Sequence, residues 1–117
     1  MDKSYKKLEV WKKSDELVKK IYKLTMGFPD TEKFGVVSQL RRCGLSIPLN
    51  IVEGSGRRNK KEFKQFINIA IGSLFELEYL LDFSKDIGYI KNEDFCELEK
   101  LKEDVGKMLW GLYKSLK

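Results

Sequence analysis

The chain has 117 residues, of which 42% are hydrophobic and 35% are charged, and it contains no histidine. This length suits one compact domain, which we place at residues 1–117, because two independent cores would need a longer chain. The lack of histidine removes the commonest general base and a common zinc ligand. We therefore expect a protein that is not an enzyme and uses no cofactor and no metal.

Membrane insertion and secretion are not expected either. No run reaches the roughly 18 uncharged apolar residues that a membrane span needs, and residues 1–12 are too polar for a secretory signal. Cys43 and Cys96 stand far apart, without a CxxC pair, so we interpret them as reduced core residues rather than a bridge. These observations predict a soluble, cytoplasmic protein.

Positive charge is concentrated in the first half of the chain. Residues 1–64 hold 16 of the 23 Lys and Arg residues but only 8 of the 18 Asp and Glu residues. Such an asymmetry could steer polyanions to one surface, or let copies of the protein meet head to tail.

The hydrophobic pattern of the first half predicts two helices. The first covers about residues 4–26 and is ended by Gly27 and Pro29. The second covers about residues 30–53, contains Pro48 and is followed by a glycine-rich turn. Its apolar positions, at steps of three and four, are Phe34, Val37, Leu40, Gly44, Ile47 and Ile51.

Two more helices are predicted in the second half. Asn59 is a good N-cap, with Glu62 three residues on, and opens a helix that continues to about Asp86 before Gly88. Asn92 is predicted to cap the last helix, which continues to the end of the chain. Alternating strand patterns are absent. We therefore predict an all-α, antiparallel, up-down-up-down four-helix bundle.

The third helix is too apolar for one buried face. Besides its core stripe it carries apolar residues on a flank, and another protein surface must shield this flank from solvent. Neighbouring helices of the same chain could supply it, but we favour an interface between copies, because small bundles gain apolar burial by association. The residues assigned to this oligomer interface are Phe66, Ile69, Leu80 and Phe83.

A polar stripe lies on the second helix, at steps of four, four and three residues. We interpret it as a structural hydrogen-bond network, since unpaired buried charge is costly. A ligand or nucleic-acid contact is the alternative, and catalysis by Glu53 is disfavoured because no second carboxylate or nucleophile is placed beside it. The stripe consists of Arg42, Ser46, Asn50 and Glu53.

Two groups of cations form a candidate phosphate-binding surface. One follows the turn Gly54–Gly56 at the start of the third helix, and the other repeats every seven residues on the first helix. Both could also be ordinary solvated surface. The candidate nucleic-acid-binding residues are Lys6, Lys13, Lys20, Arg57, Arg58, Lys60, Lys61 and Lys64.

Three segments carry a resemblance to a known family. The run SIPLNIVEGSGR at residues 46–57, QLRR at residues 39–42 and VW at residues 10–11 resemble the four-helix-bundle proteins encoded in intervening sequences of bacterial 23S ribosomal RNA genes. The resemblance implies a homopentamer. The chain is also similar to the accessory protein of diversity-generating retroelements, a basic pentameric barrel that binds nucleic acid and its reverse transcriptase.

The residues and the resemblance together favour one function. We predict a non-enzymatic, homo-oligomeric bundle that binds RNA or DNA with low specificity through phosphate contacts. The alternative is a scaffold that binds another protein and has no role with nucleic acid.

Overall fold

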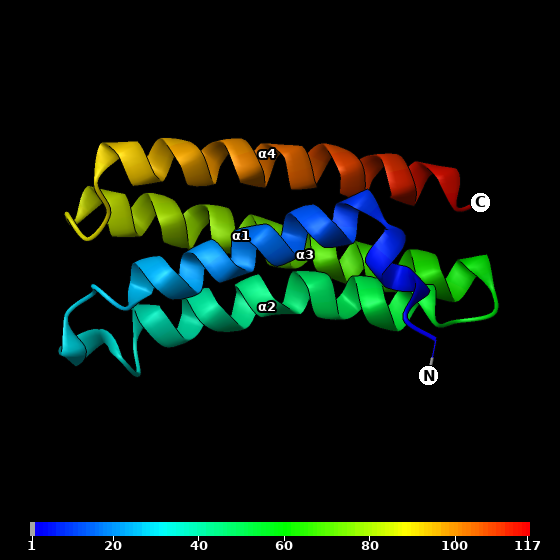
Figure 1. The fold of residues 1–117 in the computed structure, drawn as a ribbon, viewed down its shortest axis with the longest axis horizontal. Coiled ribbons are helices and arrows are strands. Elements are labelled where there is room, and N and C mark those ends of the chain that lie inside the picture. Colours follow the sequence, from blue (N-terminus) through cyan, green and yellow to red (C-terminus); the bar gives the residue numbers. More distant parts are fainter. Residues whose placement is uncertain (1) are drawn as a thin grey trace.

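A computed structural model describes residues 2–117 of the chain, and these residues form helices and no strands (Figure 1). The all-α prediction is thereby confirmed. Within the same residues, no helix has the length and apolar character that a membrane crossing demands. The four main helices are α1 (Glu9–Thr25), α2 (Val36–Ser55), α3 (Lys60–Asp86) and α4 (Asn92–Ser115), and two short 3₁₀ helices are η1 (Ser4–Lys7) and η2 (Asp30–Glu32).

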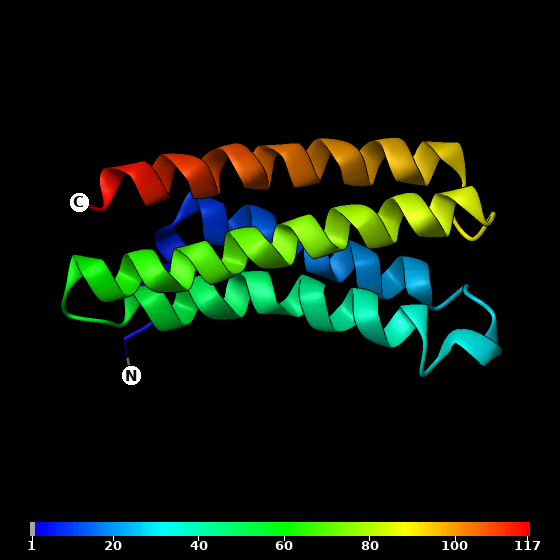
Figure 2. The ribbon, with the colours of Figure 1, turned by 180° about the vertical axis from the view of Figure 1, so that it is seen from behind.

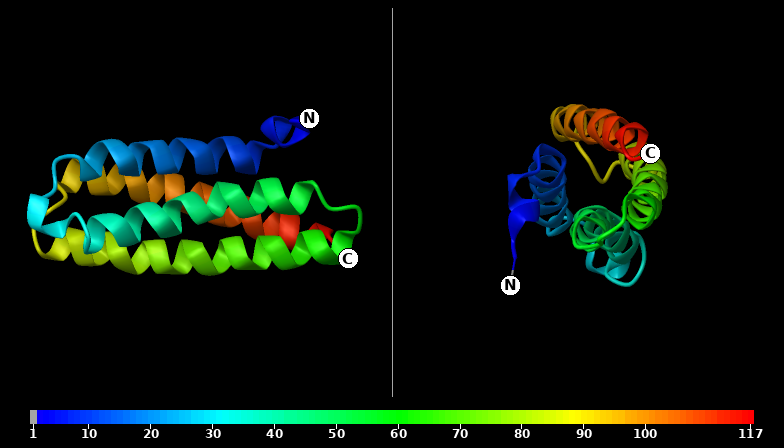
Figure 3. Two further views of the ribbon diagram at one scale, coloured as in Figure 1. Left: turned by 90° about the horizontal axis from the view of Figure 1, so that it is seen from below. Right: turned by 90° about the vertical axis from the view of Figure 1, so that its right-hand side faces the viewer.

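The four helices lie along the long axis of a molecule that measures 43 × 25 × 20 Å. Helix α1 packs against α2 and α4, and α3 packs against the same two helices, so the four surround a common centre (Figure 3, right). Figure 2 shows α3 between α2 and α4. In Figure 1 the α1–α2 and α3–α4 connections lie at one end, and the α2–α3 connection lies at the other with both termini.

The core is built from the apolar rows that periodicity predicts. Each fully buried Leu or Ile side chain contributes about 1.5–3 kcal/mol relative to exposure, so this layer is the main source of stability. All four helices supply fully buried residues, which include Leu17, Ile21, Leu40, Ile47, Ile51, Ile67, Leu77, Leu81, Leu98 and Leu109.

Helix boundaries agree with prediction at one start and differ at the other three. Helix α1 begins at Glu9 rather than near residue 4, because Leu8 adopts an extended backbone conformation between η1 and α1. The Asn59 side chain accepts a hydrogen bond of 2.8 Å from the Glu62 amide and caps α3 as predicted. Helix α4 starts one residue earlier than expected, with Asn92 as its first residue and Lys91 as the cap. Helix α2 starts at Val36, because the nonhelical backbone of Gly35 separates it from η2. Phe34 therefore lies outside α2 and is exposed, which corrects its predicted place in the apolar row.

Helices α2 and α3 make the most extensive contact in the bundle. The hydroxyl groups of Ser46 and Ser73 share a hydrogen bond of 2.8 Å between the helices. Gly54 has no side chain, and a Cβ atom built there would lie 2.7 Å from the Phe63 ring and 3.0 Å from the Cβ of Phe66. Small side chains and one glycine thus permit the close approach of the two helices.

The cysteines differ in environment. Both are free thiols, as expected, but only Cys43 is buried, whereas Cys96 lies exposed on α4. The prediction that both are core residues is wrong for Cys96. Burial raises the pKa of the Cys43 thiol to about 11, with a smaller contribution from the carboxylate of Glu76.

Replacing Gly54 with alanine tests the close approach of α2 and α3. We expect G54A to lose about 1–3 kcal/mol of unfolding free energy, because Phe63 and Phe66 must shift to admit the methyl group. Urea denaturation followed by circular dichroism measures the change. G72A is the matched control, since nothing lies within 4 Å of a Cβ at Gly72, and it should gain about 0.5–1 kcal/mol. Equal stability of G54A and the parent protein would contradict the packing described.

The two thiols should differ in reactivity. At pH 8 we expect a thiol-reactive aromatic disulfide to modify Cys96 rapidly and Cys43 only after unfolding, because Cys43 is buried and remains protonated. The released thiolate can be counted by absorbance in native buffer and in denaturant. The variant C96S isolates Cys43, and rapid labelling of that variant in native buffer would show that the site is open.

Candidate nucleic-acid interface

Six of the eight predicted cations gather at one end of the bundle. The N-terminal segment with η1 lies beside the last turn of α2, where both line one cleft. This places Lys6 at the end of the molecule that also carries the α2–α3 connection. We call this surface the basic end, and it consists of Lys6, Arg57, Arg58, Lys60, Lys61 and Lys64.

The local sequence explains why the basic end is exposed. Helix α2 ends at Ser55 and α3 begins at Lys60 after its cap Asn59, so the chain reverses over four residues, and the side chains of this turn are exposed. Lys60 and Lys61 occupy the first turn of α3, where the helix dipole adds positive potential. The result is a compact positive surface.

The cations of the basic end differ in their intramolecular contacts. Arg57 pairs with Glu53 at 3.2 Å and lies over the Phe66 ring, with its guanidinium carbon 4.9 Å from the ring centroid. The ammonium of Lys64 lies 4.6 Å from the centroid of Tyr113. Of these six cations, four form neither an ion pair nor a cation–π contact within residues 2–117, and these are Lys6, Arg58, Lys60 and Lys61.

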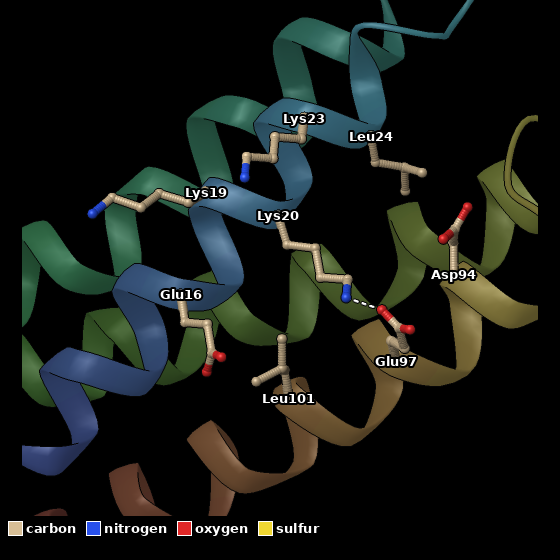
Figure 4. A pocket seen from close by; sticks show the side chains of 8 residues that line it. All are labelled: Glu16, Lys19, Lys20, Lys23, Leu24, Asp94, Glu97 and Leu101. Carbon is tan, nitrogen blue, oxygen red and sulfur yellow. Dashed lines mark hydrogen bonds and ion pairs between the residues drawn. The ribbon is translucent and has the colours of Figure 1, made fainter.

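The other two predicted cations lie away from the basic end, along α1. Lys13 pairs with Glu16 at 3.8 Å, and Lys20 reaches across to Glu97 on α4 (Figure 4). Lys20 lines a cleft between α1 and α4 in which three lysines face three carboxylates. Because these charges balance locally, the cleft has much less attraction for a polyanion than the basic end.

The predicted polar stripe on α2 divides into separate parts. The Asn50 amide donates hydrogen bonds to the Ser46 carbonyl at 2.8 Å and to the Ser46 hydroxyl at 3.0 Å. Glu53 instead pairs with Arg57, and its side chain is exposed in the cleft beside η1. Arg42 is exposed and bonds to none of the three in the described residues. Eleven residues of helix, about 16 Å, separate Arg42 from Glu53, so the two do not form one site.

The predicted flank of α3 is partly open. Ile69 and Phe83 are exposed to solvent, whereas Phe66 and Leu80 are half-buried. Sequence reasoning missed Phe75 and Tyr79, which are also exposed on α3. A helical projection shows the signal, because both residues fall opposite the buried stripe.

Sequence reasoning also missed a buried charged residue. Lys102 on α4 is buried, and its ammonium lies 3.0 Å from Glu78 and 2.8 Å from Glu99. Burial alone would lower the pKa of Lys102, but the hydrogen bonds to Glu99 and Glu78 outweigh it and raise the pKa. This ion-pair cluster joins α3 to α4.

Comparisons with known proteins identify the family. The family model for 23S rRNA-intervening sequence proteins matches residues 6–111. A crystal structure of a protein of unknown function from the S23 ribosomal protein family of Bacteroides thetaiotaomicron is similar, with a TM-score of 0.80 and 28% sequence identity. The match covers 90% of this chain and 98% of that one. No curated protein gives a significant match. The chain belongs to the 23S rRNA-intervening sequence protein family.

Proposed function

We propose that this protein is a non-enzymatic, antiparallel up-down-up-down bundle that assembles with copies of itself and binds RNA or DNA through its basic end. The observation that carries the nucleic-acid proposal is the group of four cations at that end without intramolecular partners. A phosphate backbone supplies closely spaced negative charges, and neutralising them releases bound counterions. Lys6, Arg58, Lys60 and Lys61 can contact phosphates without first breaking an ion pair.

The two remaining cations of the basic end add to the same potential. Arg57 is held by Glu53 and Phe66, and Lys64 by Tyr113, so their side chains are already oriented. Lys13 and Lys20 would extend the contact along α1 only after exchanging their carboxylate partners for phosphates. We therefore expect them to contribute less.

Sequence specificity is expected to be low. The basic end offers mostly lysine side chains, which contact phosphates as flexible point charges and carry little information about bases. Its two aromatic rings at Phe66 and Tyr113 are half-buried and already covered by Arg57 and Lys64. Base stacking and groove reading therefore have little support on this surface.

Self-association is the second part of the proposal. The exposed flank of α3, which includes Ile69 and Phe83, supports it, because large apolar side chains exposed on one face of a small protein favour an interaction site. We propose that Phe66 and Leu80 lie at the edge of this contact. A pentamer is the copy number that the family resemblance suggests.

Removing the free cations should weaken binding and its salt dependence. The variant R58Q/K60Q/K61Q loses three potential phosphate contacts, so the slope of log K against log salt should fall by about 2–3 units on duplex DNA. Fluorescence anisotropy with labelled duplex DNA and a structured RNA, measured at several salt concentrations, gives the slope.

The matched control removes equal charge from another surface. Lys91, Lys100 and Lys107 are exposed on or beside α4 and form no ion pair in the described residues, so K91Q/K100Q/K107Q should keep nearly the original slope. Equal losses in both variants would show that only net charge matters. Absence of binding to either nucleic acid in low salt would refute the nucleic-acid function and favour a protein-binding scaffold.

A further inference from the structure

A second group of cations lies away from the basic end, in a groove between α1 and the start of α2. We call it the cationic groove, and it is lined by Tyr22, Lys33, Phe34, Arg41, Arg42 and Leu45. In the described part of the chain, no Asp or Glu lines this groove. Glu32, next to Lys33 in sequence, is engaged elsewhere and accepts a hydrogen bond of 2.8 Å from the hydroxyl of Tyr89.

Arg41 is held in place within the groove. Its Nε donates a hydrogen bond of 2.9 Å to the Thr25 hydroxyl, and one terminal nitrogen donates to the Tyr22 carbonyl at 3.2 Å. The guanidinium carbon also lies 4.6 Å from the centroid of the Tyr22 ring. All of these partners are neutral, so the positive charge of Arg41 is oriented but not compensated.

The cationic groove also exposes apolar surface. Phe34 is 90% exposed, and Leu45 is 41% exposed. The Lys33 ammonium lies 5.5 Å from the Phe34 ring centroid, which leaves most of the ring open to solvent. A surface with this composition fits a partner that is both apolar and acidic.

The outward face of α3 has the opposite charge and the same apolar character. We call it the acidic face, and its large apolar residues are Ile69, Phe75, Tyr79, Phe83 and Ile87, which are 40–67% exposed. Three carboxylates, those of Glu76, Asp82 and Asp86, are exposed among them. Between residues 69 and 87 the one cation is Lys85, and its ammonium lies over the Phe95 ring of α4.

We propose that the acidic face of one copy docks into the cationic groove of a second copy. The inference rests on the proposed self-association and identifies the surface that the α3 flank meets. Each surface exposes apolar side chains that the other can cover, and the carboxylates of one oppose the uncompensated cations of the other. A single sequence therefore carries both halves of the contact.

The charges also determine the symmetry of the contact. Two cationic grooves facing each other would bring three positive charges against three, and two acidic faces would oppose three carboxylates with three. Like-charge contacts of this kind are unfavourable, so the same patch does not pair with itself. The contact is head to tail, and each added copy leaves one groove and one face free until a ring closes.

Complementary variants test this arrangement. F34S/R42E impairs the cationic groove and leaves the acidic face intact, whereas F75S/Y79S impairs the acidic face and leaves the groove intact. We expect the parent protein to exceed the mass of two chains by light scattering, and each variant alone to fall to the mass of one chain. An equal mixture should form a complex of two chains and no larger species, because only one intact groove and one intact face remain to pair.

The control variant K100E makes the same change of charge as R42E, but on α4, and should keep the parent mass. Circular dichroism spectra and melting curves show that each variant is folded.

A parent protein with the mass of one chain would refute self-association itself. An oligomeric parent whose mass is unchanged in both variants would refute these surfaces while self-association stands. A parent of two chains, or a mixture that stays at one chain, would refute the head-to-tail contact.

Discussion

The close contact between α2 and α3 is the constraint on which the other surfaces depend. It needs a glycine at position 54 and small hydroxyl side chains at Ser46 and Ser73, because bulkier groups would separate the two helices. Helix α2 carries the arginines of the cationic groove, and α3 carries the acidic face. The short connection between these helices forms much of the basic end. One packing contact therefore sets the relative positions of all three surfaces.

Local charge pairing distinguishes these surfaces from the rest of the molecule. In the cleft between α1 and α4, lysines and carboxylates occur in equal number, and Lys20 pairs with Glu97 across it. Lys102 is likewise neutralised by two carboxylates, which allows an ammonium to be buried. The overall net charge of +5 is therefore a poor guide to where a polyanion or an acidic surface would bind. What matters is which cations lack a carboxylate neighbour.

Periodicity was sufficient to predict the helices, because each one buries a regular apolar row. Asn59 could be recognised as a cap because its partner, Glu62, is three residues away. Phe34 could not be placed correctly, since its spacing continues the apolar row and only the backbone of Gly35 shows that the helix begins later. The start of α4 was predicted one residue too late for a related reason. Lys91 is the cap because its backbone is extended, and it makes no side-chain hydrogen bond that the sequence pattern could reveal.

The site was less predictable, because its character depends on contacts between distant residues. The pair Arg57–Glu53 is four residues apart and could have been anticipated. The partner of Lys20 is 77 residues away, so the sequence could not separate this lysine from the free cations. The position of Arg41 depends in the same way on Thr25, on a different helix. The exposure of Phe75 and Tyr79, in contrast, could have been predicted from a helical projection of the sequence alone.

The fixed position of Arg41 has a consequence for how the molecule meets a partner. A long side chain normally loses rotational freedom when it is captured, and this loss weakens binding. In Arg41 much of that freedom is already lost when the chain folds, because the guanidinium is tied to Thr25 and Tyr22. The hydroxyl of Thr25 is itself bound to the Ile21 carbonyl, so the tether is anchored to the helix backbone. Most of the side-chain entropy that Arg41 would lose on binding is therefore lost during folding. A carboxylate that binds in the groove meets a guanidinium donor whose orientation is already fixed.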